Sequence, residues 1–186
     1  MLPVMRRVRG VLFRDYVRML RACKTAPYRD DLAPEDLPFL DAKTDPDGWY
    51  PMATFERLGN AILKHIARGE LFPVQLWGRY SATPLATLYP TLVTTEPTET
   101  LRRFDEMRAT FFDFDAHTLV FLQDGVAHVA IAYQMGMPAE EAASYQTLGF
   151  LEGLLKLSGA TSIDGVLRER SWAGDARTLA LLRWRR

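Results

Sequence analysis

Three histidines are the residues of this sequence best suited to metal or proton chemistry. His65 lies in a helical stretch, three residues after Ile62, where an imidazole can ligate iron or transfer protons near neutral pH. His117 precedes a β-rich region and His128 lies within it. No His-x-x-x-His or Glu-adjacent metal helix accompanies any of them, and an ordinary surface or partly buried histidine explains each. We expect no metal site and no catalytic residue, and we keep His65 as a candidate pocket residue.

The single cysteine, Cys23, limits the covalent chemistry open to the chain. One cysteine cannot form an intrachain disulfide or a cysteine-based zinc site. Arg21 and Lys24 are close enough in sequence to acidify its thiol, although a plain cysteine at a helix end explains the position equally simply. This cysteine usage fits a reducing compartment, and we expect a cytoplasmic protein.

The common catalytic motifs are missing. The sequence has no Gly-x-Ser-x-Gly of a serine hydrolase and no phosphate-binding Gly-x-x-x-x-Gly-Lys or Gly-x-Gly-x-x-Gly. We therefore expect a non-enzymatic protein that needs no cofactor. The alternative is an enzyme acting on a small hydrophobic substrate, with His65 or Arg79 as its polar group.

Aromatic side chains gather in the first 114 residues and are suited to lining an apolar cavity. Arg79, beside Trp77 and Tyr80, can supply the single polar anchor that such a cavity often uses. The simpler interpretation is that these aromatic residues fill a core. The candidate pocket residues are Trp49, Trp77, Arg79, Tyr80, Phe111 and His65.

Length and charge limit the partners. The 186 residues suit one domain, here taken as 1–186, and 48% are hydrophobic, as expected of a folded globular chain. The 23 basic and 23 acidic residues cancel, so we expect neither nucleic-acid binding nor attraction to an anionic membrane. No window approaches the roughly 20 apolar residues of a membrane helix, so we expect no membrane insertion. Low net charge also favours self-association.

The first part of the chain has helical periodicity. The pattern predicts helices at 10–24, 50–69 and 98–113, with an irregular connection and a short helix near 34–40 between the first two. Gly78, Pro84 and Pro90 predict that the stretch from Leu71 to Leu92 forms two short helices meeting at a bend.

After residue 116 the periodicity changes to about two. Asp124-Gly125 predicts a hairpin of strands at 118–122 and 126–134. A helix follows with Pro138 at its first position and ends at Ser158-Gly159, and two more strands flank a turn at 173–175. The sequence therefore predicts an α+β fold: N-terminal helices packed on an antiparallel sheet of about four strands, built as hairpin, helix and hairpin.

Gly149 and Gly153 are spaced four residues apart inside the helix that follows the first hairpin. Each glycine costs about 1 kcal/mol of helix stability relative to alanine, and together they leave a shallow groove. Close packing within the chain is the first interpretation. A dimer contact and a ligand cleft are the alternatives.

The residues from Tyr145 to Arg186 resemble the C-terminal half of the fold shared by haem nitric-oxide-binding domains, vinyl-reductase-type domains and small subunits of the transport-protein-particle tether. The matching positions are Gly149, Gly153, Gly159, Gly174, Asp175 and Trp184. The segments "VRGVLF" (8–13), "GWYP" (48–51) and "LWGRYSA" (76–82) resemble more narrowly a myxobacterial paralogous family of unknown function related to that fold.

The resemblance implies a ligand-binding or adaptor domain that dimerises through its helices. A haem sensor of this kind needs a proximal histidine and a Tyr-x-Ser-x-Arg run, but "GRYSAT" places Thr83 and Pro84 where the arginine belongs. We therefore expect a signalling or adaptor domain that binds a partner protein or a small apolar ligand as a homodimer. A haem-type gas sensor with non-standard ligation is an alternative.

Overall fold

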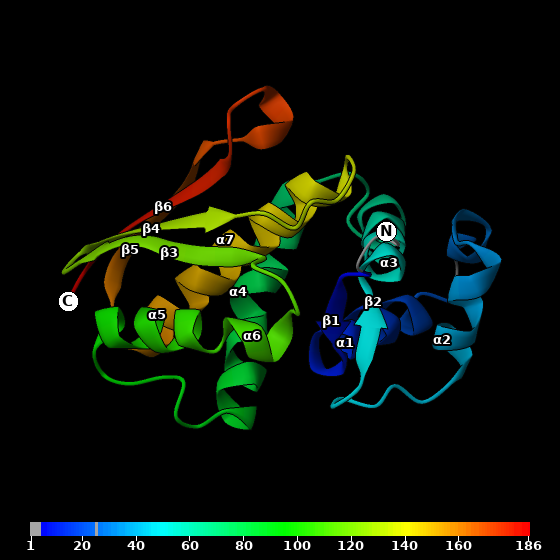
Figure 1. The fold of residues 1–186 in the computed structure, drawn as a ribbon, viewed down its shortest axis with the longest axis horizontal. Coiled ribbons are helices and arrows are strands. Elements are labelled where there is room, and N and C mark those ends of the chain that lie inside the picture. The colour runs from blue at the N-terminus through cyan, green and yellow to red at the C-terminus, as the bar shows by residue number, and fades with distance from the viewer. Residues whose placement is uncertain (1–4, 25) are drawn as a thin grey trace. The chain divides into compact units, whose positions relative to one another are not determined.

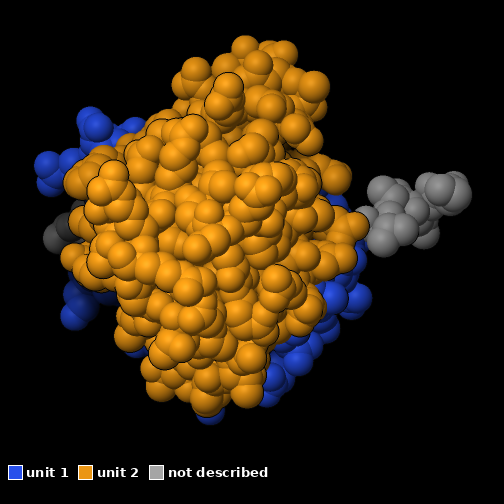
Figure 2. Space-filling view, turned by 90° about the vertical axis from the view of Figure 1, so that its left-hand side faces the viewer, with its two compact units in different colours: residues 1–70, 109–114 blue, residues 71–108, 115–186 orange. Residues whose placement is uncertain are grey.

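The computed structural model describes residues 5–24 and 26–186, which form two compact units (Figures 1 and 2). Unit 1 comprises residues 1–70 and 109–114, and unit 2 comprises residues 71–108 and 115–186. The expectation that 1–186 act as one domain stays a prediction.

Unit 1 is mostly helical. It contains β1 (Arg7–Arg9), α1 (Gly10–Ala22), the 3-10 turns η1 (Tyr28–Asp31) and η2 (Pro34–Asp36), α2 (Leu37–Asp41), β2 (Trp49–Pro51) and α3 (Met52–His65). The predicted helix at 10–24 is present and ends two residues early, at Ala22, and the short helix predicted near 34–40 is present as η2 and α2. The helix predicted at 50–69 is shorter at both ends. It begins at Met52, because the preceding three residues pair antiparallel with β1 as β2, and it ends at His65, four residues before Gly69.

Aromatic rings fill the core of unit 1. The ring of Phe13, which is fully buried, stacks on Tyr50 with 4.3 Å between centroids, and Tyr16 stacks on Phe55 at 4.0 Å. Nearby, the fully buried Asp36 receives two hydrogen bonds from Arg57, of 2.6 and 2.7 Å. Burial alone would raise the pKa of Asp36, but the hydrogen bonds from this guanidinium and from Thr54 hold it below its usual value.

Unit 2 carries the predicted antiparallel sheet. Its elements are α4 (Leu71–Leu88), α5 (Pro97–Glu106), β3 (His117–Gln123), β4 (Val126–Ile131), α7 (Ala139–Leu157), β5 (Thr161–Glu169), the 3-10 turn η3 (Ser171–Ala173) and β6 (Thr178–Arg185). The strand order is β3-β4-β6-β5, with every neighbouring pair antiparallel. Helices α5 and α7 pack on one face of this sheet (Figure 1). The predicted α+β class with a four-stranded antiparallel sheet is confirmed.

The two-helix prediction for 71–92 was wrong, because α4 runs unbroken through Gly78 and Pro84. Gly78 is buried against another helix, so its missing side chain serves packing rather than a bend. The ring of Pro84 lies on the exposed side of α4, where the helix loses one backbone hydrogen bond and continues.

The single helix predicted at 98–113 is also wrong, because it divides into α5 and the short α6 (Arg108–Phe111). Asp105 marks the break. Its carbonyl oxygen accepts a 3.0 Å hydrogen bond from Arg108, and its carboxylate accepts a 2.7 Å hydrogen bond from the backbone N–H of Leu119 on β3. These contacts end α5 at the sheet.

The predicted strand at 126–134 stops three residues early, at Ile131. The backbone N–H groups of Tyr133 and Met135 turn away from the sheet and donate to the carboxylate of Glu140. Pro138 is the N-cap of α7 rather than its first helical residue, and the predicted end of that helix at Ser158-Gly159 is confirmed.

Candidate functional site

Helices α4 and α7 meet backbone to backbone along a seam of three glycines. A Cβ at Gly149 would overlap the carbonyl oxygen of Gln75 on α4, and a Cβ at Gly78 would overlap that of Gln146 on α7. Gly153 faces the carbonyl oxygen of Arg79 in the same way. The strip that the sequence left open between Gly149 and Gly153 is therefore occupied by α4 of the same chain. Glycine is required here because any side chain would force the helices apart.

A buried carboxylate lies beside this seam. The Glu152 side chain is 6% exposed and accepts a 2.6 Å hydrogen bond from Nη2 of Arg79. Gln75 donates to both carboxylate oxygens, at 3.1 and 3.2 Å. On the sheet side, a Cβ at Gly165 would lie 2.6 Å from Oε1 of Glu152. These contacts link α4, α7 and β5, and they pair the partly exposed Arg79 with a buried carboxylate.

A second buried carboxylate fixes the loop that leads into α7. Glu140 accepts hydrogen bonds from the backbone N–H groups of Tyr133, at 3.1 Å, and Met135, at 2.8 Å. The phenol of Tyr133 lies 2.6 Å from the hydroxyl of Thr147. Burial raises the pKa of Tyr133 to about 12. This tyrosine is therefore neutral at physiological pH and serves as a hydrogen-bonding group.

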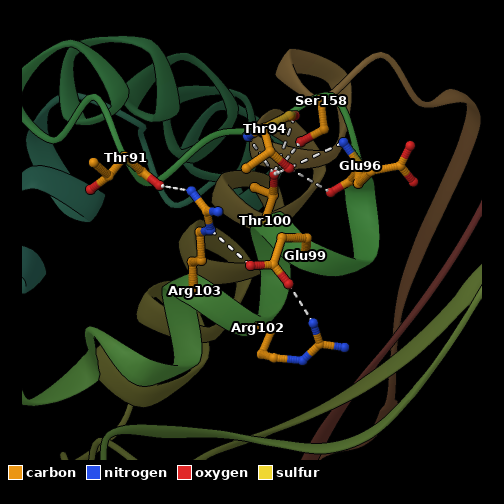
Figure 3. A network of polar contacts seen from close by, with 8 residues as sticks. All are labelled: Thr91, Thr94, Glu96, Glu99, Thr100, Arg102, Arg103 and Ser158. Carbon is orange, nitrogen blue, oxygen red and sulfur yellow. Dashed lines mark hydrogen bonds and ion pairs between the residues drawn. The ribbon is translucent and has the colours of Figure 1, made fainter.

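A polar network joins the N-terminus of α5 to the C-terminus of α7 (Figure 3). The buried hydroxyl of Thr100 accepts hydrogen bonds from the hydroxyl of Ser158, at 2.8 Å, and from the backbone N–H of Thr94, at 2.9 Å. Glu99, which immediately precedes Thr100, pairs with Arg102 and Arg103, and Arg103 also donates to the carbonyl oxygen of Thr91. The network fixes α5 against the end of α7.

The three histidines have different surroundings. His117 is buried, and its ring is parallel to that of Phe104 on α5, with 4.6 Å between centroids. Burial lowers the pKa of His117 to about 4, so the imidazole is neutral at physiological pH. His128 lies on β4 next to the exposed Phe121, and His65 is hydrogen-bonded to Asp31.

The six candidate pocket residues are divided between the units. Trp77, Arg79 and Tyr80 lie on α4 in unit 2, where the Tyr80 side chain is 68% exposed. In unit 1, Phe111 is buried, and Trp49 is half-buried with the guanidinium groups of Arg7 and Arg9 over its ring. His65, also in unit 1, ends α3. A pocket formed by these residues stays a prediction.

The two buried carboxylates, Glu140 and Glu152, were not predicted from the sequence. A signal was present for Glu152, because a glutamate between Leu151 and Gly153 in an otherwise apolar stretch is unusual on a helix that must be buried. Glu140 lies in the first turn of α7, where the helix dipole favours any acidic residue, so its sequence position carries no signal of burial. Within the described residues, no group of three or more His, Cys, Asp or Glu side chains is placed to hold a metal ion.

Comparison with known proteins identifies the fold. The H-NOX protein from S. oneidensis in its Fe(II)NO ligation state is 12% identical to this chain, with a TM-score of 0.66, and the match covers 96% of this chain and 99% of that one. The unliganded Fe(II) H-NOX protein from K. algicida is 12% identical, with a TM-score of 0.68, covering 96% and 97%. A mutant of the H-NOX protein from T. tengcongensis is 13% identical, with a TM-score of 0.60, covering 96% and 98%.

No family model and no curated protein matches the sequence. The structural matches nevertheless extend over almost the whole length of both chains. The protein therefore has the H-NOX fold, as the resemblance in its C-terminal part predicted.

The H-NOX fold implies haem, but the donor groups of this chain do not fit it. No tyrosine in the sequence has serine two residues later and arginine four residues later. The nearest segment, "GRYSAT", is part of α4, where Ser81 donates to the carbonyl oxygen of Gly78 and Arg79 is bound to Glu152. Of the three histidines, His65 is hydrogen-bonded to the carboxylate of Asp31, and the ring of the buried His117 is stacked on Phe104.

Among the residues that the structure describes, no helix is long and apolar enough to cross a membrane.

Proposed function

We propose that this protein is a non-enzymatic signalling or adaptor domain that uses the H-NOX fold without haem. It binds a partner protein or a small apolar ligand, and it acts as a homodimer in the cytoplasm. The observation that carries the proposal is the full-length match to H-NOX proteins in a chain that lacks the Tyr-x-Ser-x-Arg run and whose Arg79 is bound to Glu152.

The pairing of Arg79 gives the clearest support. An arginine that holds an anionic ligand must offer its guanidinium to that ligand, but Arg79 is bound to Glu152, whose charge is buried. An external carboxylate that took Arg79 would leave the buried Glu152 with its hydrogen bonds from Gln75 but without its charge partner, at a cost in stability. The pair therefore favours a structural role for Arg79.

Haemin titration of the purified chain, followed by absorption spectroscopy, tests the proposal. We expect no shifted Soret band and no stoichiometric complex. A one-to-one haem complex whose spectrum changes in His117→Ala would overturn the proposal and establish the alternative, a haem sensor with non-standard ligation.

Native mass spectrometry tests ligand and assembly together. We expect a dimer, and a mass above that of two chains if a small ligand is retained on purification. A clean unliganded monomer would contradict the homodimer and the retained ligand, leaving partner-protein binding as the surviving form of the proposal.

A further inference from the structure

One face of the sheet in unit 2 carries an apolar row that spans all four strands. In the strand register, Phe121 on β3 lies opposite His128 on β4, His128 lies opposite Leu181 on β6, and Leu181 lies opposite Val166 on β5. Residues directly opposite each other in a sheet share a face. We call these four residues the cross-sheet row.

The cross-sheet row lies on the face away from α7. The helix contacts the sheet at Gly165, which faces Leu148 and Glu152, and side chains alternate along a strand, so the neighbouring Val166 points the other way. With the whole chain present, Phe121 is 40% exposed and Val166 is 43% exposed. Val120, in the bulge of β3, is 46% exposed beside them. The row is therefore open at both ends, at Phe121 and Val166, whereas Leu181 between them is 4% exposed.

Two exposed arginines border the row. Arg183 and Arg185 alternate with the buried Leu182 and Trp184 on β6, so both lie on the face of the cross-sheet row, and both are exposed. Within the described part of the chain, neither forms an ion pair, whereas Arg177 and Arg186 do. Asp164 lies opposite Arg183 in the register.

The charge of this region differs from that of the whole chain. Residues 161–186 hold six arginines and three acidic residues, although the full sequence has no net charge. Of the three acidic residues, Glu169 pairs with Arg177, and Asp175 accepts a hydrogen bond from the backbone of Arg170. The excess positive charge therefore faces solvent beside exposed apolar side chains.

We propose that this sheet face binds an acidic, amphipathic segment of a partner protein, with apolar side chains on the cross-sheet row and carboxylates on Arg183 and Arg185. The inference rests on the partner-binding form of the proposed function. Charge complementarity selects the occupant. A second copy docked face to face would bring both pairs of arginines into one interface, and a nucleic acid would leave the apolar row without a partner.

A designed peptide tests the surface on the full chain. The peptide is a leucine–glutamate helix of about 18 residues, five turns long, with its leucines on one face. We expect it to bind in fluorescence anisotropy, more weakly at high salt, and to shift backbone amide signals of β3, β4, β5 and β6 in NMR. An all-glutamate peptide of equal charge should bind much more weakly, because it cannot cover the row.

Variants separate the electrostatic contribution to peptide binding from the apolar contribution. We expect Arg183→Ala/Arg185→Ala to weaken peptide binding about tenfold, and Val166→Asp to weaken it comparably. The matched control is Arg18→Ala/Lys43→Ala, which removes two exposed cations from unit 1 and should leave the affinity unchanged. Thermal unfolding of each variant confirms that the fold is intact.

Four results would overturn the inference: no binding of the leucine–glutamate peptide, equal binding of the all-glutamate peptide, shifts confined to the helices, or tighter binding of a DNA duplex. Haemin titration and native mass spectrometry of the same preparation report on the proposed function independently. If the peptide does not bind but the protein binds no haem and is dimeric as expected, the docking surface alone is rejected and the proposed function stands.

Discussion

The two units of this protein bring their helices together with opposite kinds of residue. In unit 1 the α1–α3 region is filled by large rings, with Phe13 on Tyr50 and Tyr16 on Phe55. In unit 2 the α4–α7 seam contains glycines, and the backbones themselves are in contact. A core of side chains can adjust rotamers when one residue changes, but two touching backbones have no such freedom. The same substitution should therefore have unequal effects in the two units.

The first prediction compares one substitution in both units and has the largest expected effect. Gly149→Ala should destabilise the protein by at least about 3 kcal/mol, because its Cβ meets the backbone of Gln75. Gly59→Ala on α3 should change stability by less than about 1 kcal/mol, since its Cβ lies 3.2 Å from the Tyr16 ring and alanine favours the helix. Urea unfolding of both variants measures the difference. Equal losses would remove the contrast between the units.

The second prediction concerns pH. The pKa of His117 in the folded protein is lowered to about 4, so the unfolded state binds more protons between that value and about 6.5. The contribution of His117 to the free energy of unfolding should be fully present above about pH 6.5, and the protein should lose about 3 kcal/mol of stability as the pH drops towards 4. In His117→Phe, which preserves an aromatic ring against Phe104, this part of the pH dependence should vanish. If the stability of the variant fell with pH as steeply as that of the unmodified protein, the pH dependence would belong to other titratable groups.

The third prediction compares the buried ion pairs of the two units. Arg57→Ala should cost about 2 to 3 kcal/mol, because it leaves the fully buried Asp36 without its guanidinium. Arg79→Ala should cost less, since Gln75 still donates to both oxygens of Glu152. Because the folded pKa of Asp36 is lowered, its stabilisation is present above about pH 4, and the cost of Arg57→Ala should shrink as the pH falls further. The free energy of unfolding of both variants, measured at neutral and acidic pH, tests this order. A larger loss of stability for Arg79→Ala than for Arg57→Ala would contradict the prediction.

The smallest expected effects lie in the polar network of unit 2. Thr100→Val should cost about 1 kcal/mol, because it removes the acceptor for Ser158 and for the backbone of Thr94. Arg102→Ala, which removes an exposed pair with Glu99, should cost less than about 0.5 kcal/mol. Thermal unfolding of the two variants compares them. A larger loss for Arg102→Ala would show that the surface pairs, rather than the buried hydroxyl, fix α5.

Periodicity predicted those elements whose local pattern agrees with their packing. Asp124-Gly125 indicated the hairpin because a two-residue turn needs the positive φ that Gly125 adopts. The same reasoning failed at Gly78, where glycine was interpreted as a break although α4 continues. Glycine has the same local propensity in both cases. What differs is the neighbouring helix, and Gln146, the residue of α7 that Gly78 contacts, lies 68 positions further along the chain.

The polar positions were harder to predict than the fold. Arg79 was identified as a polar anchor from its aromatic neighbours, but its partner Glu152 is 73 residues away in sequence. Such a pairing leaves no local signal. The burial of His117 likewise depends on the meeting of α5 with β3, which a single sequence does not encode at short range.

The glycine seam also has a mechanical consequence. Because the backbones of α4 and α7 interlock at Gly78, Gly149 and Gly153, neither helix can slide or roll without the other. Glu152 extends this coupling to β5 through the space left by Gly165. Any molecule that displaced α4 would therefore have to move α7 and the β5 edge of the sheet together with it, as one rigid group.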